Sequence, residues 1–217
     1  MPLSLHLYLS LLEQQQHHTT QAMREHLAQR KQALANLRCQ ILAQHLHISP
    51  EAIQFAYHAQ GKPFLHSEPS VAFNISHSKQ VFALLLTEQR GVEIGVDIEQ
   101  LDRNVRFDAL AKHCFHDEEY ALWQQQGATV AHWFKIWTVK EAVLKAHGLG
   151  IRLNLNSLNT QITLDSTHGK IEHEQLGQIA FQVFPYDIGQ QKVMIAVAWC
   201  GECAELEPHS EIIIQQF

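Results

Sequence analysis

The sequence has few cysteines, no excess of positive charge and no long apolar run, and each shortage excludes a class of protein. Its four cysteines are too few and too scattered for a disulfide framework. The net charge of −6 argues against general nucleic-acid binding, which needs cations to displace counterions from phosphates. No run of about 18 apolar residues occurs, so no transmembrane helix is expected. We therefore expect a cytoplasmic protein without nucleic-acid or membrane partners.

The first part of the chain reads as a strand, a long helix and then a group of strands. Apolar residues alternate over residues 1–9, and they recur at intervals of three and four over residues 20–47. Three strand-like runs follow, separated by turn-sized gaps, at residues 71–75, 81–87 and 92–98. Their short spacing predicts an antiparallel meander.

The second part repeats this order, with helices before strands. Residues 106–126 and 130–147 have helical patterns, and Gly148 stands where a helix C-cap is expected. Four strand-like runs come next, at residues 162–164, 170–173, 179–185 and 192–200. The apolar residues 212–214 in the tail are left unplaced. Helices followed by antiparallel runs favour an α+β fold over a parallel α/β fold.

Two acidic residues stand at alternate positions in the run Gly95-Val96-Asp97-Ile98-Glu99. In a strand, residues i and i+2 share a face, so both carboxylates would point the same way while Val96 and Ile98 face the core. A cation between them would relieve their repulsion, and their hard oxygen ligands favour Mg²⁺, Ca²⁺ or Mn²⁺. A solvated strand edge with two unrelated acids is the alternative.

A second motif lies in the helix predicted over residues 130–147. Glu141 and Lys145 are i and i+4 neighbours there, and Trp137 lies one turn earlier on the same face. The same spacing also suits an ordinary helix-stabilising ion pair, worth about 0.3–0.5 kcal/mol. Taken alone, this motif does not decide between a site and a surface pair.

Two further segments offer donors to an anion. Phe73-Asn74-Ile75-Ser76-His77-Ser78 ends a predicted strand with hydroxyl and imidazole groups. Upstream, Gly61-Lys62-Pro63 places a cation on a turn. A polar hairpin turn explains the first segment equally well when it is considered alone.

The combination of these motifs, in this order and with these gaps, resembles the 4′-phosphopantetheinyl transferases of the Sfp type. The resemblance runs from about residue 30 to residue 150. The sequence differs from the commoner family pattern at Lys79, which follows Ser-His-Ser where glycine is frequent. The metal motif is unaffected by this difference.

The resemblance implies a role for each motif. Asp97, Glu99 and Glu141 would bind Mg²⁺, with Mn²⁺ as an alternative, and Glu141 would also be the general base. Lys145 would contact the pyrophosphate of coenzyme A, and the catalytic residues would be Glu141, Lys145 and Asp97. The remaining contacts to coenzyme A would come from residues on the turn, the strand end and the early helix: Lys62, Ser76, His77, Arg30, Lys31 and Arg38.

The resemblance also implies two similar α+β halves with the active site in the cleft between them. The N-terminal half would be residues 1–93 and would contact the 3′-phosphate of coenzyme A, and the C-terminal half would be residues 94–217 and would carry the metal-binding and catalytic motifs. A monomer is expected. The enzyme would move 4′-phosphopantetheine from coenzyme A to a serine of an apo acyl or peptidyl carrier protein and release 3′,5′-bisphosphoadenosine.

Two other functions suit parts of the pattern. A metal-dependent nuclease also uses strand acids followed by Glu and Lys, although the net charge argues against it. A carrier-binding protein with a degenerate metal site is the other alternative, and the intact acids argue against it. The sequence does not distinguish among fatty acid, polyketide and peptide synthase carriers.

Overall fold

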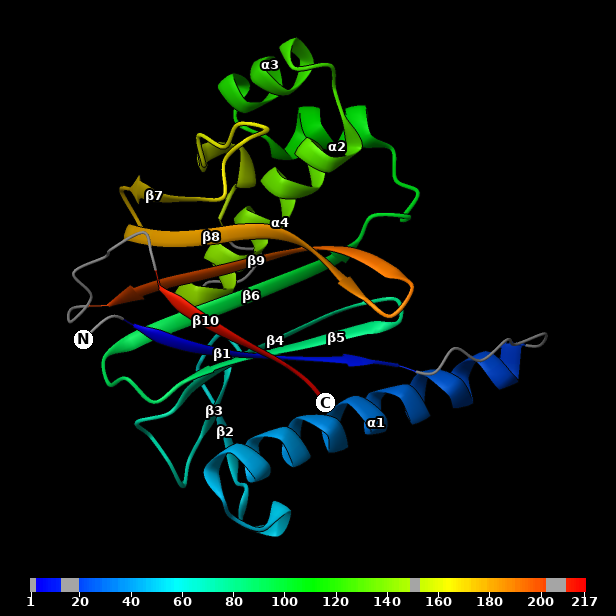
Figure 1. The fold of residues 1–217 in the computed structure, drawn as a ribbon, viewed down its shortest axis with the longest axis vertical. Helices are drawn as coiled ribbons and strands as arrows, with labels where there is room; N and C mark the ends of the chain where they lie inside the picture. Colours follow the sequence, from blue (N-terminus) through cyan, green and yellow to red (C-terminus); the bar gives the residue numbers. More distant parts are fainter. Residues whose placement is uncertain (1–2, 13–19, 149–152, 202–209) are drawn as a thin grey trace.

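A computed structural model describes residues 3–12, 20–148, 153–201 and 210–217. These residues form a mixed α+β structure in which helices flank two β-sheets (Figure 1). The α+β class expected from the sequence is therefore confirmed. Among the helices of the described residues, none has the length and apolar character needed to cross a membrane.

The first sheet has the strand order β10-β1-β5-β4. Its strands are β1 (Ser4–Leu11), β4 (Ala72–Ser78), β5 (Val81–Thr87) and β10 (Glu211–Gln216). β1 pairs antiparallel with β5 and parallel with β10. The apolar residues 212–214, which the sequence pattern left unplaced, thus belong to β10, an edge strand of the first sheet.

The second sheet has the order β6-β9-β8-β7, and every pair in it is antiparallel. Its strands are β6 (Val92–Gln100), β7 (His168–His173), β8 (Gly177–Ile188) and β9 (Gln191–Gly201). A short hairpin of β2 (Phe55–Tyr57) and β3 (Pro63–Leu65) follows the 3₁₀ turn η1 (Pro50–Ala52). A second 3₁₀ turn, η3, spans Leu155–Ser157.

The layers follow from the period-two pattern of the strands. One buried cluster joins the facing sides of the two sheets, and it includes Leu5 and Leu7 of β1 and Val96 and Ile98 of β6. The outer side of the first sheet packs against α1 (Thr20–Leu46). The outer side of the second sheet packs against α2 (Phe107–Cys114), α3 (Asp117–Gln125) and α4 (Val130–His147). Figure 1 shows α1 and the group α2–α4 on opposite sides of the paired sheets.

The predicted meander is wrong at its third strand. β4 and β5 form the expected antiparallel pair, but β6 pairs with β9 in the other sheet. The cause is non-local, because β9 offers β6 a ladder from Val92 to Gln100 and buries its apolar side between the sheets. β6 nevertheless stays close to β4, since the edges of the two sheets lie beside each other.

Two further predictions on secondary structure need correction. The single helix expected over residues 106–126 is two helices, because His116 caps α3 with its side chain and forms a capping box with Glu119. Residues 162–164 form no strand. The N-terminal strand, the long helix and the helix over residues 130–147 with its Gly148 cap are confirmed.

The division of the chain between residues 93 and 94 stays a prediction. One observation bears on it: β10, within the proposed C-terminal part, pairs with β1 of the N-terminal part. Residues 13–19, most of the predicted polar loop, lie outside the described residues, as does residue 150, where the resemblance ends.

Candidate active site

The two acids of β6 lie on one side of the strand, as predicted from the period of two. Asp97 and Glu99 are 5% and 7% exposed, whereas Val96 and Ile98 point into the core between the sheets. The side that carries the acids also carries Gly95, which lies directly against the backbone of α4. The carboxylates therefore face the helix that bears Glu141 and Lys145.

Lys145 and Ser76 hold one oxygen of Asp97. The Lys145 ammonium donates to Asp97 Oδ1 at 2.7 Å and to Ser76 Oγ at 3.0 Å. Ser76 Oγ in turn donates to the same Asp97 oxygen at 2.9 Å. Residues from β4, β6 and α4, which are far apart in the sequence, thus meet at one point.

The other two acids belong to the same electrostatic cluster. The pKa of Glu141 is raised, first by burial and then by the negative charge of Asp97, with Lys145 opposing the shift. The pKa of Glu99 is also raised by burial and by Asp97, while hydrogen bonds from Ser78 and Trp137 lower it. The negative charge of Asp97 therefore raises the pKa of both glutamates, which places the three carboxylates in one electrostatic cluster.

This cluster fits a divalent cation. Asp97 Oδ2 is buried and has no hydrogen-bond partner among the described residues. A buried oxygen without a partner is costly, and a metal ion would satisfy it. Among the residues that the structure describes, no set of three or more His, Cys, Asp and Glu side chains is already gathered around a single ion position. The oxygen ligands of the acids have the right chemistry for Mg²⁺.

Lys62 is held by groups on β6 and α4, and none of its hydrogen bonds among the described residues is with the three acids. Its ammonium donates to Glu93 Oε2 at 2.6 Å, to the Ala146 carbonyl at 2.8 Å and to the Ile94 carbonyl at 3.3 Å. These bonds tie the turn before β3 to β6 and to the C-terminal end of α4. An ammonium has three donors, so all of them are engaged here.

Arg30 and His77 lie together on the α1 side of β4. Burial lowers the pKa of His77 most, and the positive charge of Arg30 is the next largest cause. Both residues line a cavity of about 360 Å³, together with Lys79 and Arg103. Ser76 and His77 point to opposite sides of β4, because strand residues alternate. His77 still feels the charges of Lys145 and Asp97 at the sheet edge.

The other basic candidates on α1 lie apart from this cavity. Arg38 stacks its guanidinium 3.9 Å above the Phe55 ring and does not line the cavity around Arg30. Lys31 is exposed on the helix. Lys79, the residue that replaces the frequent glycine, occupies the β4–β5 turn at φ 42° and forms an ion pair with Asp102 at 2.8 Å.

Residues 93–198 match the model of the 4′-phosphopantetheinyl transferase superfamily. A putative 4′-phosphopantetheinyl transferase, slr0495 from Synechocystis, is 32% identical over 189 residues, which is 82% of this chain and 74% of the relative. The chain belongs to the 4′-phosphopantetheinyl transferase superfamily.

Two other relatives of the superfamily match over a shorter span. The 4′-phosphopantetheinyl transferase gsp of Aneurinibacillus migulanus is 34% identical over 54% of this chain and 47% of its own length. The transferase HetI of Nostoc is 36% identical over 51% of this chain and 48% of its own length. The matched segment thus spans about half the length of these two relatives. The matched family region contains Asp97, Glu99, Glu141 and Lys145.

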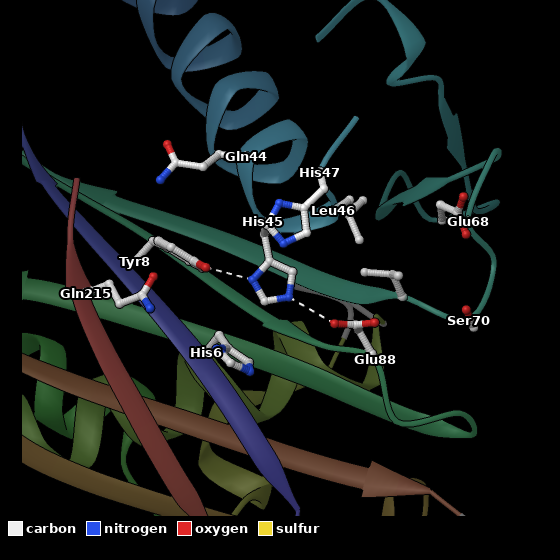
Figure 2. Close-up of a pocket in the computed structure, with 11 residues that line it drawn as sticks. His6, Tyr8, Gln44, His45, Leu46, His47, Glu68, Ser70, Glu88 and Gln215 are labelled. Carbon is white, nitrogen blue, oxygen red and sulfur yellow. Dashed lines mark hydrogen bonds and ion pairs between the residues drawn. The ribbon is translucent and has the colours of Figure 1, made fainter. Parts of the chain in front are cut away.

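A larger cavity, about 620 Å³, lies away from the acids of this family member. It opens between the end of α1 and the outer side of the first sheet (Figure 2). Figure 2 shows Tyr8, His45 and Glu88 in a chain of hydrogen bonds, with Tyr8 Oη to His45 Nδ1 at 2.7 Å and His45 Nε2 to Glu88 Oε1 at 3.1 Å. The cavity shares no residue with the acid cluster, so its size does not make it the active site of a phosphopantetheinyl transferase.

Sequence reasoning named Asn74, Ser78 and Trp137 within motifs but missed their contacts with β6, and it missed Arg103 altogether. Ser78 donates to Glu99 Oε2 at 2.6 Å, and Arg103 donates to Glu99 Oε1 at 2.5 Å. Trp137 is a further donor to Glu99, and Asn74 accepts a bond from the Val96 amide at 3.0 Å. Asn74 and Ser78 flank Ser76 at alternate positions, a period-two pattern that would have indicated a shared polar side of β4.

Proposed function

We propose that this protein transfers 4′-phosphopantetheine from coenzyme A to a serine of an apo acyl or peptidyl carrier protein. The observation that carries the proposal is the meeting of Asp97, Glu141 and Lys145 in a member of this superfamily. The relatives named above are called 4′-phosphopantetheinyl transferases. The activity is that of a holo-acyl-carrier-protein synthase.

The acids and Lys145 suit the pyrophosphate of coenzyme A. Asp97, Glu99 and Glu141 would hold Mg²⁺, or Mn²⁺ in its place, which when bound supplies positive charge to the pyrophosphate oxygens. Lys145 adds a second positive charge at the same point, and its bond to Asp97 keeps the ammonium in the site. Lys145 thus binds and orients the donor substrate.

Glu141 is the proposed general base. Burial and neighbouring carboxylates raise its pKa, so it is a stronger base than an exposed glutamate. Glu141, directly or through one water, takes the proton of the carrier serine. The serine oxygen forms a bond to the phosphorus that carries the pantetheine arm, and the bond from that phosphorus to the bridging oxygen breaks. 3′,5′-Bisphosphoadenosine leaves with the electron pair.

The other coenzyme A contacts are proposed from the same arrangement. Arg30 and His77 line a cationic cavity beside Glu99, where the 3′-phosphate has complementary charge. Ser76 contacts Lys145 and so lies at the proposed pyrophosphate site. Lys62 would have to exchange one of its protein partners, such as the Ala146 carbonyl, for a phosphate oxygen. Arg38 lies over Phe55, so a part in binding requires it to leave that ring. Lys31 is an exposed candidate on the same helix.

The proposal includes an organisation into two similar α+β halves, residues 1–93 and 94–217, with the site in the cleft between them. The contact of β4 with β6 and α4 supports it, because each half contributes side chains to the cluster. A monomeric state and a cytoplasmic location remain predictions. A metal-dependent nuclease remains the competing activity.

Glu141→Gln tests the joint role of Glu141 as base and metal ligand. The variant keeps a hydrogen-bonding side chain of similar size but cannot accept the serine proton. We expect coenzyme A binding to remain measurable by calorimetry while transfer to an apo carrier falls at least about 100-fold. Glu172→Gln, at an exposed position of β7, is the matched control and should behave as wild type. Near wild-type turnover of Glu141→Gln would refute the assignment.

A further inference from the structure

The acidic strand β6 is held against β4 by side chains instead of a backbone ladder. β4 and β6 are edge strands of different sheets, yet contacts between them are extensive. Three alternate residues of β4 bridge the gap: Asn74, Ser76 and Ser78. All three are buried. Their partners advance along β6 in the same order, from the Val96 amide to Asp97 and then to Glu99.

Ser78 has a defined direction of hydrogen bonding within this ladder. The backbone N–H of Gln100 can only donate, and its nitrogen lies 3.2 Å from Ser78 Oγ. The hydroxyl of Ser78 therefore accepts from Gln100 and has its single proton free for Glu99 Oε2, at 2.6 Å. Hydrogen bonds to a carboxylate are short and about twice as strong as neutral ones, so this contact fixes the rotamer of Glu99.

The two oxygens of Glu99 are held by groups of different strength. Oε2 bonds to the buried Ser78, whereas Oε1 bonds to Arg103, whose side chain is 44% exposed. Solvent reaches the Arg103 end of this ion pair, so the pair is screened more than the buried contact to Ser78. The buried hydroxyl is thus the fixed contact, and the side of Glu99 held by Arg103 is the one that can open toward a cation.

We propose that Ser78 is a positioning residue that orients Glu99 as a ligand for the divalent cation. The proposal rests on the proposed function, because Glu99 needs a fixed rotamer only if it binds a metal. Removing a group that hydrogen-bonds to a metal ligand commonly lowers the metal affinity by about 10–100-fold. Ser76 differs from Ser78 in that its hydroxyl also contacts Lys145, so its loss would affect the donor site directly.

Three variants separate this role from ordinary stabilisation. Ser78→Ala removes the hydroxyl, and Ser78→Thr keeps it. Thr87→Val is the matched control, since Thr87 is buried in the neighbouring strand and bonds to the Ser4 carbonyl at 2.9 Å, away from the acids. The readouts are Mn²⁺ binding by electron paramagnetic resonance, the thermal midpoint, and transfer of phosphopantetheine.

We expect Ser78→Ala to weaken Mn²⁺ binding about 10-fold, with a thermal midpoint no lower than that of Thr87→Val. Ser78→Thr and Thr87→Val should bind Mn²⁺ as wild type does. Unchanged Mn²⁺ affinity in Ser78→Ala overturns the proposal, and so does equal weakening in Ser78→Thr or Thr87→Val. If wild type transfers phosphopantetheine in such a case, only the role of Ser78 fails. If wild type neither binds Mn²⁺ nor transfers, the proposed function fails with it.

Discussion

Gly95 of β6 lies so close to α4 that a side chain does not fit between them. A Cβ added at Gly95 would lie 2.1 Å from the Ala142 carbonyl oxygen and 2.3 Å from the Ala146 amide nitrogen. Both contacts are with backbone, which cannot rotate away as a side chain can. This close approach sets the distance between the strand that bears Asp97 and the helix that bears Glu141 and Lys145.

Gly95→Ala should therefore be severely destabilising. The added methyl forces β6 and α4 apart, and overpacking of this kind costs about 3 kcal/mol or more. Urea denaturation of the purified variant measures the loss, and activity should fall with it because Asp97 separates from Lys145. A variant with the wild-type unfolding midpoint would show that the helix and strand are not packed as closely as described.

A buried ion pair anchors the other side of α4. Lys140 and Glu119 are fully buried, with 2.7 Å between Lys140 Nζ and Glu119 Oε2. Lys140 also donates to the Leu155 and Leu158 carbonyls. Glu119 accepts from the amides of His116 and Thr160. Burial lowers the pKa of Lys140, and the negative charge of Glu119 opposes that shift. Through these contacts the ion pair joins α3, α4 and η3.

Lys140→Met should cost about 3–5 kcal/mol of unfolding free energy, because Glu119 would remain buried without its cation. Glu119→Gln in the Lys140→Met background should recover part of that loss. A double-mutant cycle by chemical denaturation checks the coupling. Additive effects of the two substitutions would contradict it. A catalytic role for Lys140 is not expected, since all its donors are engaged with protein oxygens.

Removal of one acid from the cluster should stabilise the protein when no metal is bound. The carboxylates of Asp97 and Glu99 both raise the pKa of Glu141, which shows that they repel its negative charge. Glu141→Gln removes this repulsion, so we expect a higher thermal midpoint than wild type in the presence of a chelator. Addition of Mg²⁺ should raise the midpoint of wild type and leave that of the variant nearly unchanged. An equal response in both would exclude Glu141 as a metal ligand.

Acid destabilisation of the protein should come partly from His132. This residue is fully buried, its Nε2 lies 3.1 Å from the Ile162 carbonyl, and burial lowers its pKa below the ordinary 6.5. A histidine with a lowered pKa in the folded state contributes full stability above about pH 6.5, which is lost as the pH falls toward the lowered value.

His132→Gln keeps a donor toward Ile162 but cannot be protonated. The fall in unfolding free energy between about pH 7.5 and about pH 5.5 should be smaller in this variant, by up to about 1.4 kcal/mol for each unit by which the pKa was lowered. His6 and His77 also have lowered pKa values, so some dependence remains. His113→Gln, at an exposed position of α2, is the control, and an identical slope in both variants would contradict the assignment.

Local periodicity predicted the part of the site that lies within single elements. The alternation along residues 95–99 placed Asp97 and Glu99 on one side, and the helical spacing placed Glu141 one turn from Lys145. The short-range pattern is sufficient here because each motif lies within one strand or one helix. The resemblance to the family, and not periodicity, brought the two motifs together.

Contacts between distant segments were not predictable in this way. β6 reads as the third strand of a meander, but its ladder forms with β9, about a hundred residues later in the chain. The same limit hid the parallel pairing of β10 with β1 and the bond from Ser78 to Glu99. No local pattern specifies which distant strand offers the better partner, since that choice depends on the buried area between the sheets.

The most direct test of the account is the intact mass of an apo carrier protein after incubation with this protein, coenzyme A and Mg²⁺. We predict that the carrier gains the mass of one phosphopantetheine arm, and that a chelator or Asp97→Asn prevents the gain. An unchanged carrier mass, with cleavage of added DNA instead, would contradict the proposed transfer and favour the nuclease.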